Sequence, residues 1–174
     1  MFKGLMDVLT MKSDGITRIW IQKVRKSPNL KKYNSLDEQQ LLELNRDLYK
    51  NLGFWFSKDI DKNQVGAFFA RLGKTRLKEG YPVSEISFSL LLAQRSVLEY
   101  LSQECVADNS MVLYQVLDLT RQVADFFFLG SYYMLKGYLE DAYLGLHNKE
   151  SLSEEVLKKY LSDEFFFKDV DSSR

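Results

Sequence analysis

The sequence contains one cysteine, one histidine and two prolines in 174 residues. The single cysteine, Cys105, excludes an intramolecular disulfide and fits a reducing compartment, so we expect a cytoplasmic protein. Around His147 no cysteine or carboxylate cluster lies at ligand spacing, so we expect neither a metal site nor haem. Strand-like alternation and Pro- or Ser-rich linkers are also missing, which predicts an all-α protein.

The formal net charge of the chain is zero, because 24 Lys and Arg residues balance 24 Asp and Glu residues. This balance argues against a dedicated nucleic-acid binder. The start of the chain lacks the pattern of a signal peptide, and no stretch approaches 18 uninterrupted apolar residues, so we expect no membrane span. We expect one helical domain over residues 1–174, with residues 1–12 loose and residues 163–174 forming a tail.

The centre of the chain, residues 68–101, predicts two helices joined by a tight turn. The first helix ends at Gly80, since glycine takes the left-handed conformation after a helix without a Cβ penalty. The second helix begins at Pro82, which is tolerated in a first helical turn. Gly66 and Gly73 lie seven residues apart on one face of the first helix. They predict a close crossing with another helix, at which Gly73 is a packing glycine.

The second of these helices is apolar over most of its circumference. An ordinary surface helix buries a single apolar stripe, so this one is either central in its domain or shared with a partner. Its two stripes are Val83, Ile86, Leu90, Ala93, Val97 and Leu101, and Phe88, Leu91, Leu92, Leu98 and Tyr100.

Apolar spacing predicts about six helices, of which the last two long ones are antiparallel. A capping box of Ser35 and Glu38 is expected to open the second helix. The predicted ranges are 14–26, 35–57, a glycine-bearing helix that ends at 79, 82–104, 110–147, and a last helix that starts at 151 or 153.

The sequence shows no catalytic signature and no Gly-rich phosphate loop, so we expect no catalytic residues and no cofactor. Basic residues at positions 71, 74, 76 and 78 wind round their helix and are expected to be solvated. The aromatic triplets 126–128 and 165–167 are expected in a core or an interface, with a ligand cavity as the less favoured interpretation.

A group of residues in the central stretch resembles the N-terminal domain of the RsbR/RsbRD proteins, which are RsbT co-antagonists of bacterial stressosomes. These residues are Phe69, Leu72, Gly73, Arg76, Glu79, Gly80, Pro82 and Glu85, followed by a leucine-rich helix. The resemblance implies a non-haem globin-like fold, a homodimer built on the last two long helices, and a sensor role in stress-response signal transduction. Those relatives continue into a STAS domain or a kinase, and neither is recognisable in this chain.

Two hypotheses therefore stand. The preferred one is a homodimeric, non-catalytic sensor or adaptor that binds a protein signalling partner and has room for a small ligand. The alternative is a small-molecule-binding protein or enzyme whose apolar helical pocket holds a lipid-like or aromatic ligand. An enclosed cavity with convergent polar groups would favour the alternative hypothesis. A solid core with an apolar outer patch would favour the preferred hypothesis. The expected dimer interface is Phe88, Leu91, Leu92, Leu98, Ala124, Phe127, Phe128 and Leu135.

Overall fold

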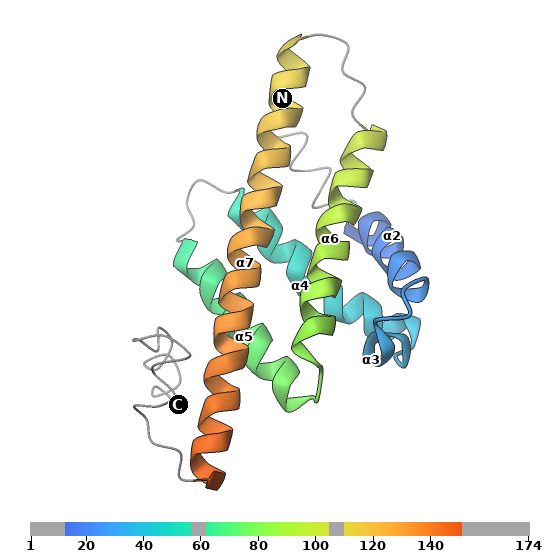
Figure 1. Ribbon diagram of the computed structural model, residues 1–174. Helices are drawn as coiled ribbons and strands as arrows, with labels where there is room; N and C mark the ends of the chain where they lie inside the picture. The colour runs from blue at the N-terminus through green and yellow to red at the C-terminus, as the bar shows by residue number, and fades with distance from the viewer. Residues whose placement is uncertain (1–12, 57–61, 105–109, 151–174) are drawn as a thin grey trace.

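The computed structural model describes residues 13–56, 62–104 and 110–150, and every regular element in them is a helix (Figure 1). The elements are α2 (Ser13–Arg25), α3 (Lys31–Asn34), α4 (Glu38–Trp55), α5 (Lys62–Lys78), α6 (Val83–Glu104) and α7 (Ser110–Glu150). The predicted all-α fold is confirmed, and α6 and α7 run antiparallel as predicted. The predicted loose ends and the predicted last helix lie outside the described residues.

The start of α4 differs from the prediction, because its capping box is formed by Asp37 and Gln40. A carboxylate oxygen of Asp37 accepts a hydrogen bond from the Gln40 backbone N–H at 2.8 Å, and the Gln40 side-chain oxygen accepts one from the Asp37 N–H at 2.9 Å. Ser35 instead donates to the Lys32 carbonyl at 2.7 Å. That bond closes α3, a short helix that the sequence pattern did not indicate, and Ser35 is therefore not available to cap α4.

The turn between α5 and α6 forms as predicted. Gly80 has a φ of 75°, and its N–H donates to the Leu77 carbonyl at 2.9 Å. The N–H of Tyr81 donates to the Arg76 carbonyl, also at 2.9 Å. These two bonds make a complete Schellman motif, which satisfies the last carbonyls of α5 and lets α6 begin at once.

Helices α5 and α7 cross with their backbones in contact. A Cβ atom added to Gly73 would overlap the Met134 carbonyl, and one added to Gly137 would overlap the Ala70 carbonyl. Each helix therefore supplies a glycine that admits the backbone of the other. The prediction that Gly73 is a packing glycine at a helix crossing is confirmed.

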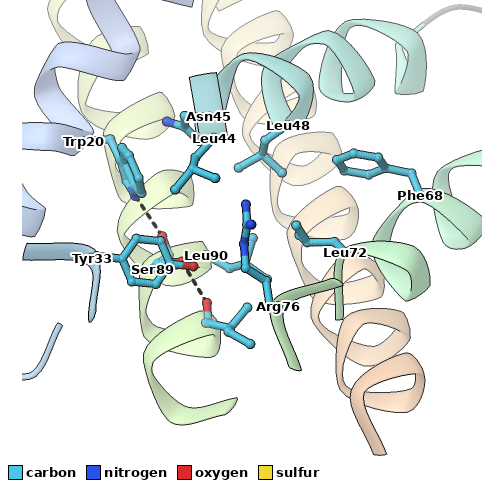
Figure 2. Close-up of a pocket in the computed structure, with 11 residues that line it drawn as sticks. Trp20, Tyr33, Leu44, Asn45, Leu48, Phe68, Leu72, Arg76, Ser89 and Leu90 are labelled. Carbon is cyan, nitrogen blue, oxygen red and sulfur yellow. Dashed lines mark hydrogen bonds between the residues drawn. The ribbon is translucent and has the colours of Figure 1, made fainter. Parts of the chain in front are cut away.

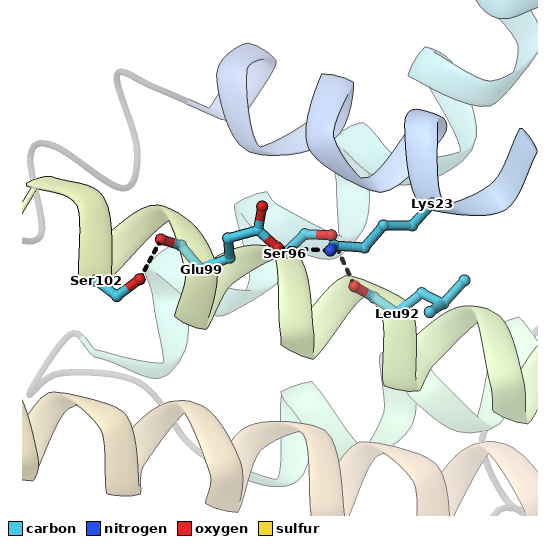
Figure 3. Close-up of polar contacts among 5 residues, drawn as sticks. All are labelled: Lys23, Leu92, Ser96, Glu99 and Ser102. Carbon is cyan, nitrogen blue, oxygen red and sulfur yellow. Dashed lines mark hydrogen bonds and ion pairs between the residues drawn. The ribbon is translucent and has the colours of Figure 1, made fainter. Parts of the chain in front are cut away.

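Helix α6 is central, between α2 on one side and α7 on the other (Figure 3). Its first predicted stripe is buried almost throughout, including Ile86, Leu90 and Val97. From α2, the indole N–H of Trp20 donates to the Ser89 carbonyl at 3.0 Å, and Lys23 forms an ion pair with Glu99 at 2.5 Å. The second stripe is also buried or half-buried, except for Leu91. A single chain therefore covers most of α6 by itself.

Candidate functional site

Helix α7 presents an apolar row of side chains to solvent. Its members are three, eleven, four and three residues apart, and because eleven residues make about three helical turns, all of them lie on one side of the helix. We call this set the α7 face, and it consists of Tyr114, Leu117, Phe128, Tyr132 and Leu135. Phe128 is 80% exposed and Tyr114 is 73% exposed. Leu91, on the neighbouring helix α6, is exposed too.

The structure separates the predicted interface residues into three groups. Leu91, Phe128 and Leu135 are exposed, whereas Phe88, Leu98 and Ala124 are half-buried. Leu92 and Phe127 lie in the core of the same chain and do not belong to the exposed set. The residues adjacent to them, Leu91 and Phe128, point to solvent, because adjacent residues of a helix are rotated by about 100°.

Sequence reasoning missed three exposed members of the α7 face, namely Tyr114, Leu117 and Tyr132, as interface candidates. The signal was present in their spacing with Phe128. The spacing did not identify the exposed row, because the core-facing row of α7, which includes Val123 and Phe126, is equally apolar.

The exposed side of α7 carries an ion pair and a second acid. Arg121 forms an ion pair with Asp118 at 2.8 Å, and Gln122 also donates to that carboxylate at 2.6 Å. These hydrogen bonds, that of Arg121 first, lower the pKa of Asp118 below its usual value. Asp118 and, more weakly, Asp125 raise the pKa of Arg121. The exposed side of α7 thus carries both signs of charge within two turns.

Arg76 corrects the expectation that the basic residues of α5 are solvated. Arg71 and Lys78 are exposed, but Arg76 is only 7% exposed. It shares the core-facing side of α5 with Phe69 and Gly73, seven and three residues earlier, and that spacing was the available signal. Its guanidinium donates to Glu79, one helical turn further on.

A cavity of about 30 Å³ lies beside the Arg76 guanidinium, which points into it (Figure 2). A water molecule needs about 10–15 Å³ of such space, so the cavity has room for roughly two. Leu44, Leu48, Leu72 and Leu90 line its apolar side, and Tyr33, Asn45, Arg76 and Ser89 supply polar groups.

Two of those polar groups, on Tyr33 and Asn45, are buried and interact with neighbouring side chains. Burial raises the pKa of the Tyr33 phenol, and the Ser89 hydroxyl at 3.0 Å and the Arg76 guanidinium partly offset this effect. The amide of Asn45 is buried, and its hydrogen bond with Tyr49 partly offsets the rise that burial causes in the pKa of the Tyr49 phenol.

A larger pocket of about 440 Å³ opens on the other side of Leu44, whose side chain lines both spaces. Charged and polar residues line it, among them Lys32 and Glu79. The Arg76 guanidinium carbon lies 5.2 Å from the centre of the Tyr81 ring, and that ring also lines the larger pocket. Leu44, Tyr81 and the Arg76–Glu79 pair therefore separate the inner cavity from the outer pocket.

Within residues 13–56, 62–104 and 110–150, no group of three or more His, Cys, Asp and Glu side chains is placed to hold a metal ion. His147 belongs to the last part of α7, and its side chain is outside the described set, as is Cys105. None of the described helices combines the length and the apolar character needed to cross a membrane.

No family model, curated protein or solved structure matches the chain.

Proposed function

We propose that the chain is a non-catalytic, homodimeric sensor or adaptor module of bacterial signal transduction, similar to the non-haem globin-like N-terminal domain of RsbR stressosome proteins. It acts in the cytoplasm by binding a protein partner. The observation that carries this proposal is the exposed Phe128 at the centre of the α7 face.

The α7 face supports association because exposed large apolar side chains cost free energy in water. Burying one Leu or Phe side chain contributes about 1.5–3 kcal/mol. Monomeric soluble proteins rarely expose a contiguous apolar patch of large side chains unless it contacts a partner.

A second copy of this chain is the occupant that the charges favour. Arg121 interrupts the α7 face between Leu117 and Phe128, and the acids Asp118 and Asp125 border it, so two copies related by a two-fold axis can set opposite charges against each other. The formal net charge of the chain is zero, so long-range repulsion between copies is absent.

The alternative, a binding protein or enzyme for a lipid-like or aromatic ligand, has less support. The cavity inside the helical core measures about 30 Å³, whereas pockets for drug-sized ligands measure roughly 300–1,000 Å³. The larger pocket lies outside Leu44 and is lined mostly by polar and charged side chains. A packed core with an apolar outer face fits the sensor or adaptor better.

The test is the mass of the protein in solution at micromolar concentration, measured by light scattering for the wild type and two variants. We expect a dimeric wild type and a monomeric Phe128→Asp variant. Leu144→Asp is the matched control, because Leu144 is an exposed leucine of the same helix, and at about 100° per residue it is rotated by roughly 160° from Phe128. It should remain dimeric. A soluble monomeric wild type, or a dimer that tolerates Phe128→Asp, would contradict the proposal.

A further inference from the structure

The exposed row on α7 has the same spacing in both directions along the helix. It consists of the α7 face and Arg121, whose side chain is 72% exposed and interrupts the face. Its six positions are separated by three, four, seven, four and three residues, and the midpoint lies between Ala124 and Asp125. A two-fold axis at this midpoint brings each position of the row opposite another position of the row on an antiparallel second copy.

This symmetry sets large side chains against one another along the whole row. The opposed pairs are Tyr114 with Leu135, Leu117 with Tyr132, and Arg121 with Phe128. An arginine placed over an aromatic ring is attracted by the negative face of the ring, more strongly where water is excluded. Ala124, beside the axis, is half-buried and small, so it permits a close approach of the two helices.

The charges of α7 favour this antiparallel arrangement over a parallel one. In a parallel pair each residue meets its own copy, so the two Arg121 guanidinium groups would face each other in the middle of the interface, which is unfavourable. In the antiparallel pair Arg121 lies about 4.5 Å along the helix axis from Asp125 of the second copy. The two Asp125 carboxylates then lie between the two arginines, and the four charges sum to zero.

We propose that a second copy binds antiparallel along α7, with the two-fold axis between Ala124 and Asp125, and that Arg121 of each copy stacks on the Phe128 ring of the other. The residue that interrupts the apolar row in one copy thus covers the 80% exposed ring of the other. Phe128→Asp still disrupts this dimer, because it removes both rings and Arg121 is already paired with Asp118. The inference rests on the proposed function, since it requires the homodimer, and it adds the orientation and the contact that selects it.

Cysteine cross-linking tests the orientation. Leu117→Cys and Tyr132→Cys are introduced together and singly in a Cys105→Ser background, which removes the one native thiol. In the antiparallel dimer the two new thiols meet across the interface, so oxidation should convert the double variant into a covalent dimer. Each single variant should stay non-covalent, because its two thiols lie 15 residues, or about 22 Å, apart along the helices, whereas a disulfide needs Cα atoms within about 7 Å.

Light scattering before oxidation keeps the orientation separate from the proposed function. A monomeric wild type would overturn both, and would mean that a different protein or another segment of the chain covers the α7 face. A dimer in which Leu117→Cys alone becomes covalent would leave the proposed function standing and show that the helices are parallel, which overturns the orientation. A dimeric double variant that does not cross-link would overturn the orientation as well.

A double-mutant cycle on the dimer dissociation constant tests the contact between Arg121 and Phe128. Within one chain these residues are seven positions, or about 10 Å, apart, so a coupling between them arises between copies. Arg121→Gln and Phe128→Leu should each raise the constant. Together they should raise it by less than the product of the single effects, by a factor of roughly five to thirty for two contacts per dimer.

Arg71→Gln is the matched control, because it removes an exposed arginine on α5, and its effect should multiply with that of Phe128→Leu. Independent effects of Arg121→Gln and Phe128→Leu would overturn the stacking. This measurement needs no introduced cysteine, so it decides the matter even if the cysteine variants do not dimerise.

Discussion

The phenol of Tyr138 donates a hydrogen bond to the backbone carbonyl of Tyr81 across 3.0 Å. This bond joins α7 to the turn between α5 and α6, 57 residues earlier in the chain. Tyr81 also lines the outer pocket beside the Arg76–Glu79 pair. The wall of the outer pocket is therefore attached directly to the helix that carries the α7 face.

Removing that hydroxyl should weaken the attachment. We expect Tyr138→Phe to lower the free energy of unfolding by about 1 kcal/mol, the usual net contribution of one hydrogen bond. Urea denaturation measures the change. A variant as stable as the wild type would show that the bond to Tyr81 contributes nothing.

The crossing of α5 and α7 predicts opposite effects for two glycines. Gly73→Leu should destabilise the protein by about 1–3 kcal/mol or more, because the leucine side chain would overlap the Met134 carbonyl. Gly145→Ala, in exposed helix with nothing within 4 Å of an added Cβ, should stabilise it by up to about 1 kcal/mol. Thermal unfolding compares both with the wild type. A rise in melting temperature for Gly73→Leu would be inconsistent with the crossing.

Substitutions at the start of α4 distinguish the cap seen in the structure from the cap predicted from the sequence. Asp37→Ala should cost about 0.5–2 kcal/mol, because it leaves the Gln40 N–H without its acceptor. Glu38→Ala, at the position that the sequence pattern assigned to the box, should cost much less. Chemical denaturation of the two variants decides between them, and a larger loss for Glu38→Ala would favour the predicted cap.

Titration of Asp118 by NMR should give a pKa below the ordinary aspartate value, because Arg121 and Gln122 donate hydrogen bonds to the carboxylate. The folded-state pKa is lowered relative to the unfolded chain. The stability that this carboxylate contributes is thus present above the unfolded pKa and is lost as the pH falls through the folded pKa. Arg121→Gln should raise the Asp118 pKa toward its ordinary value. An unchanged pKa in that variant would refute the assigned cause.

We also expect that the protein binds no haem. Absorption spectra recorded after haem addition should show no Soret shift that depends on His147. A shift that disappears in a His147→Ala variant would contradict this prediction, and a shift that persists would be nonspecific.

The sequence predicted those parts of the fold that local chemistry decides. Gly80 and Pro82 fixed the turn before α6, and the seven-residue spacing of Gly66 and Gly73 indicated a helix crossing. The cap of α4 was harder, since Ser35–Glu38 and Asp37–Gln40 have the same spacing. Only the structure shows that Ser35 closes α3 instead.

The candidate sites depended on tertiary contacts that spacing alone does not give. Phe127 and Phe128 are adjacent and identical in chemistry, yet one is 2% and the other 80% exposed. Which of them faces α5 and α6 depends on the rotation of α7 about its axis. The winding of the basic residues round α5 predicts that Arg76 is solvated, although it shares a face with Gly73. Its burial depends on partners, Tyr81 and Glu79, that only the turn brings to it.

The contact of bare backbone at Gly73 and Gly137 makes the crossing of α5 and α7 a fulcrum. At this point no side chain separates the two helices, whereas further along the Tyr133 ring packs on Gly66 and the Phe69 ring packs on Gly130, so a tilt of α7 about the crossing would change these side-chain contacts. About 27 residues separate Gly137 from Ser110, which at about 1.5 Å per residue is an arm of roughly 40 Å. A tilt of about 5° at the fulcrum displaces the far end of that arm by ~3.5 Å. All of the α7 face lies along the arm, so a tilt at the crossing would be magnified at the surface where two copies are proposed to meet.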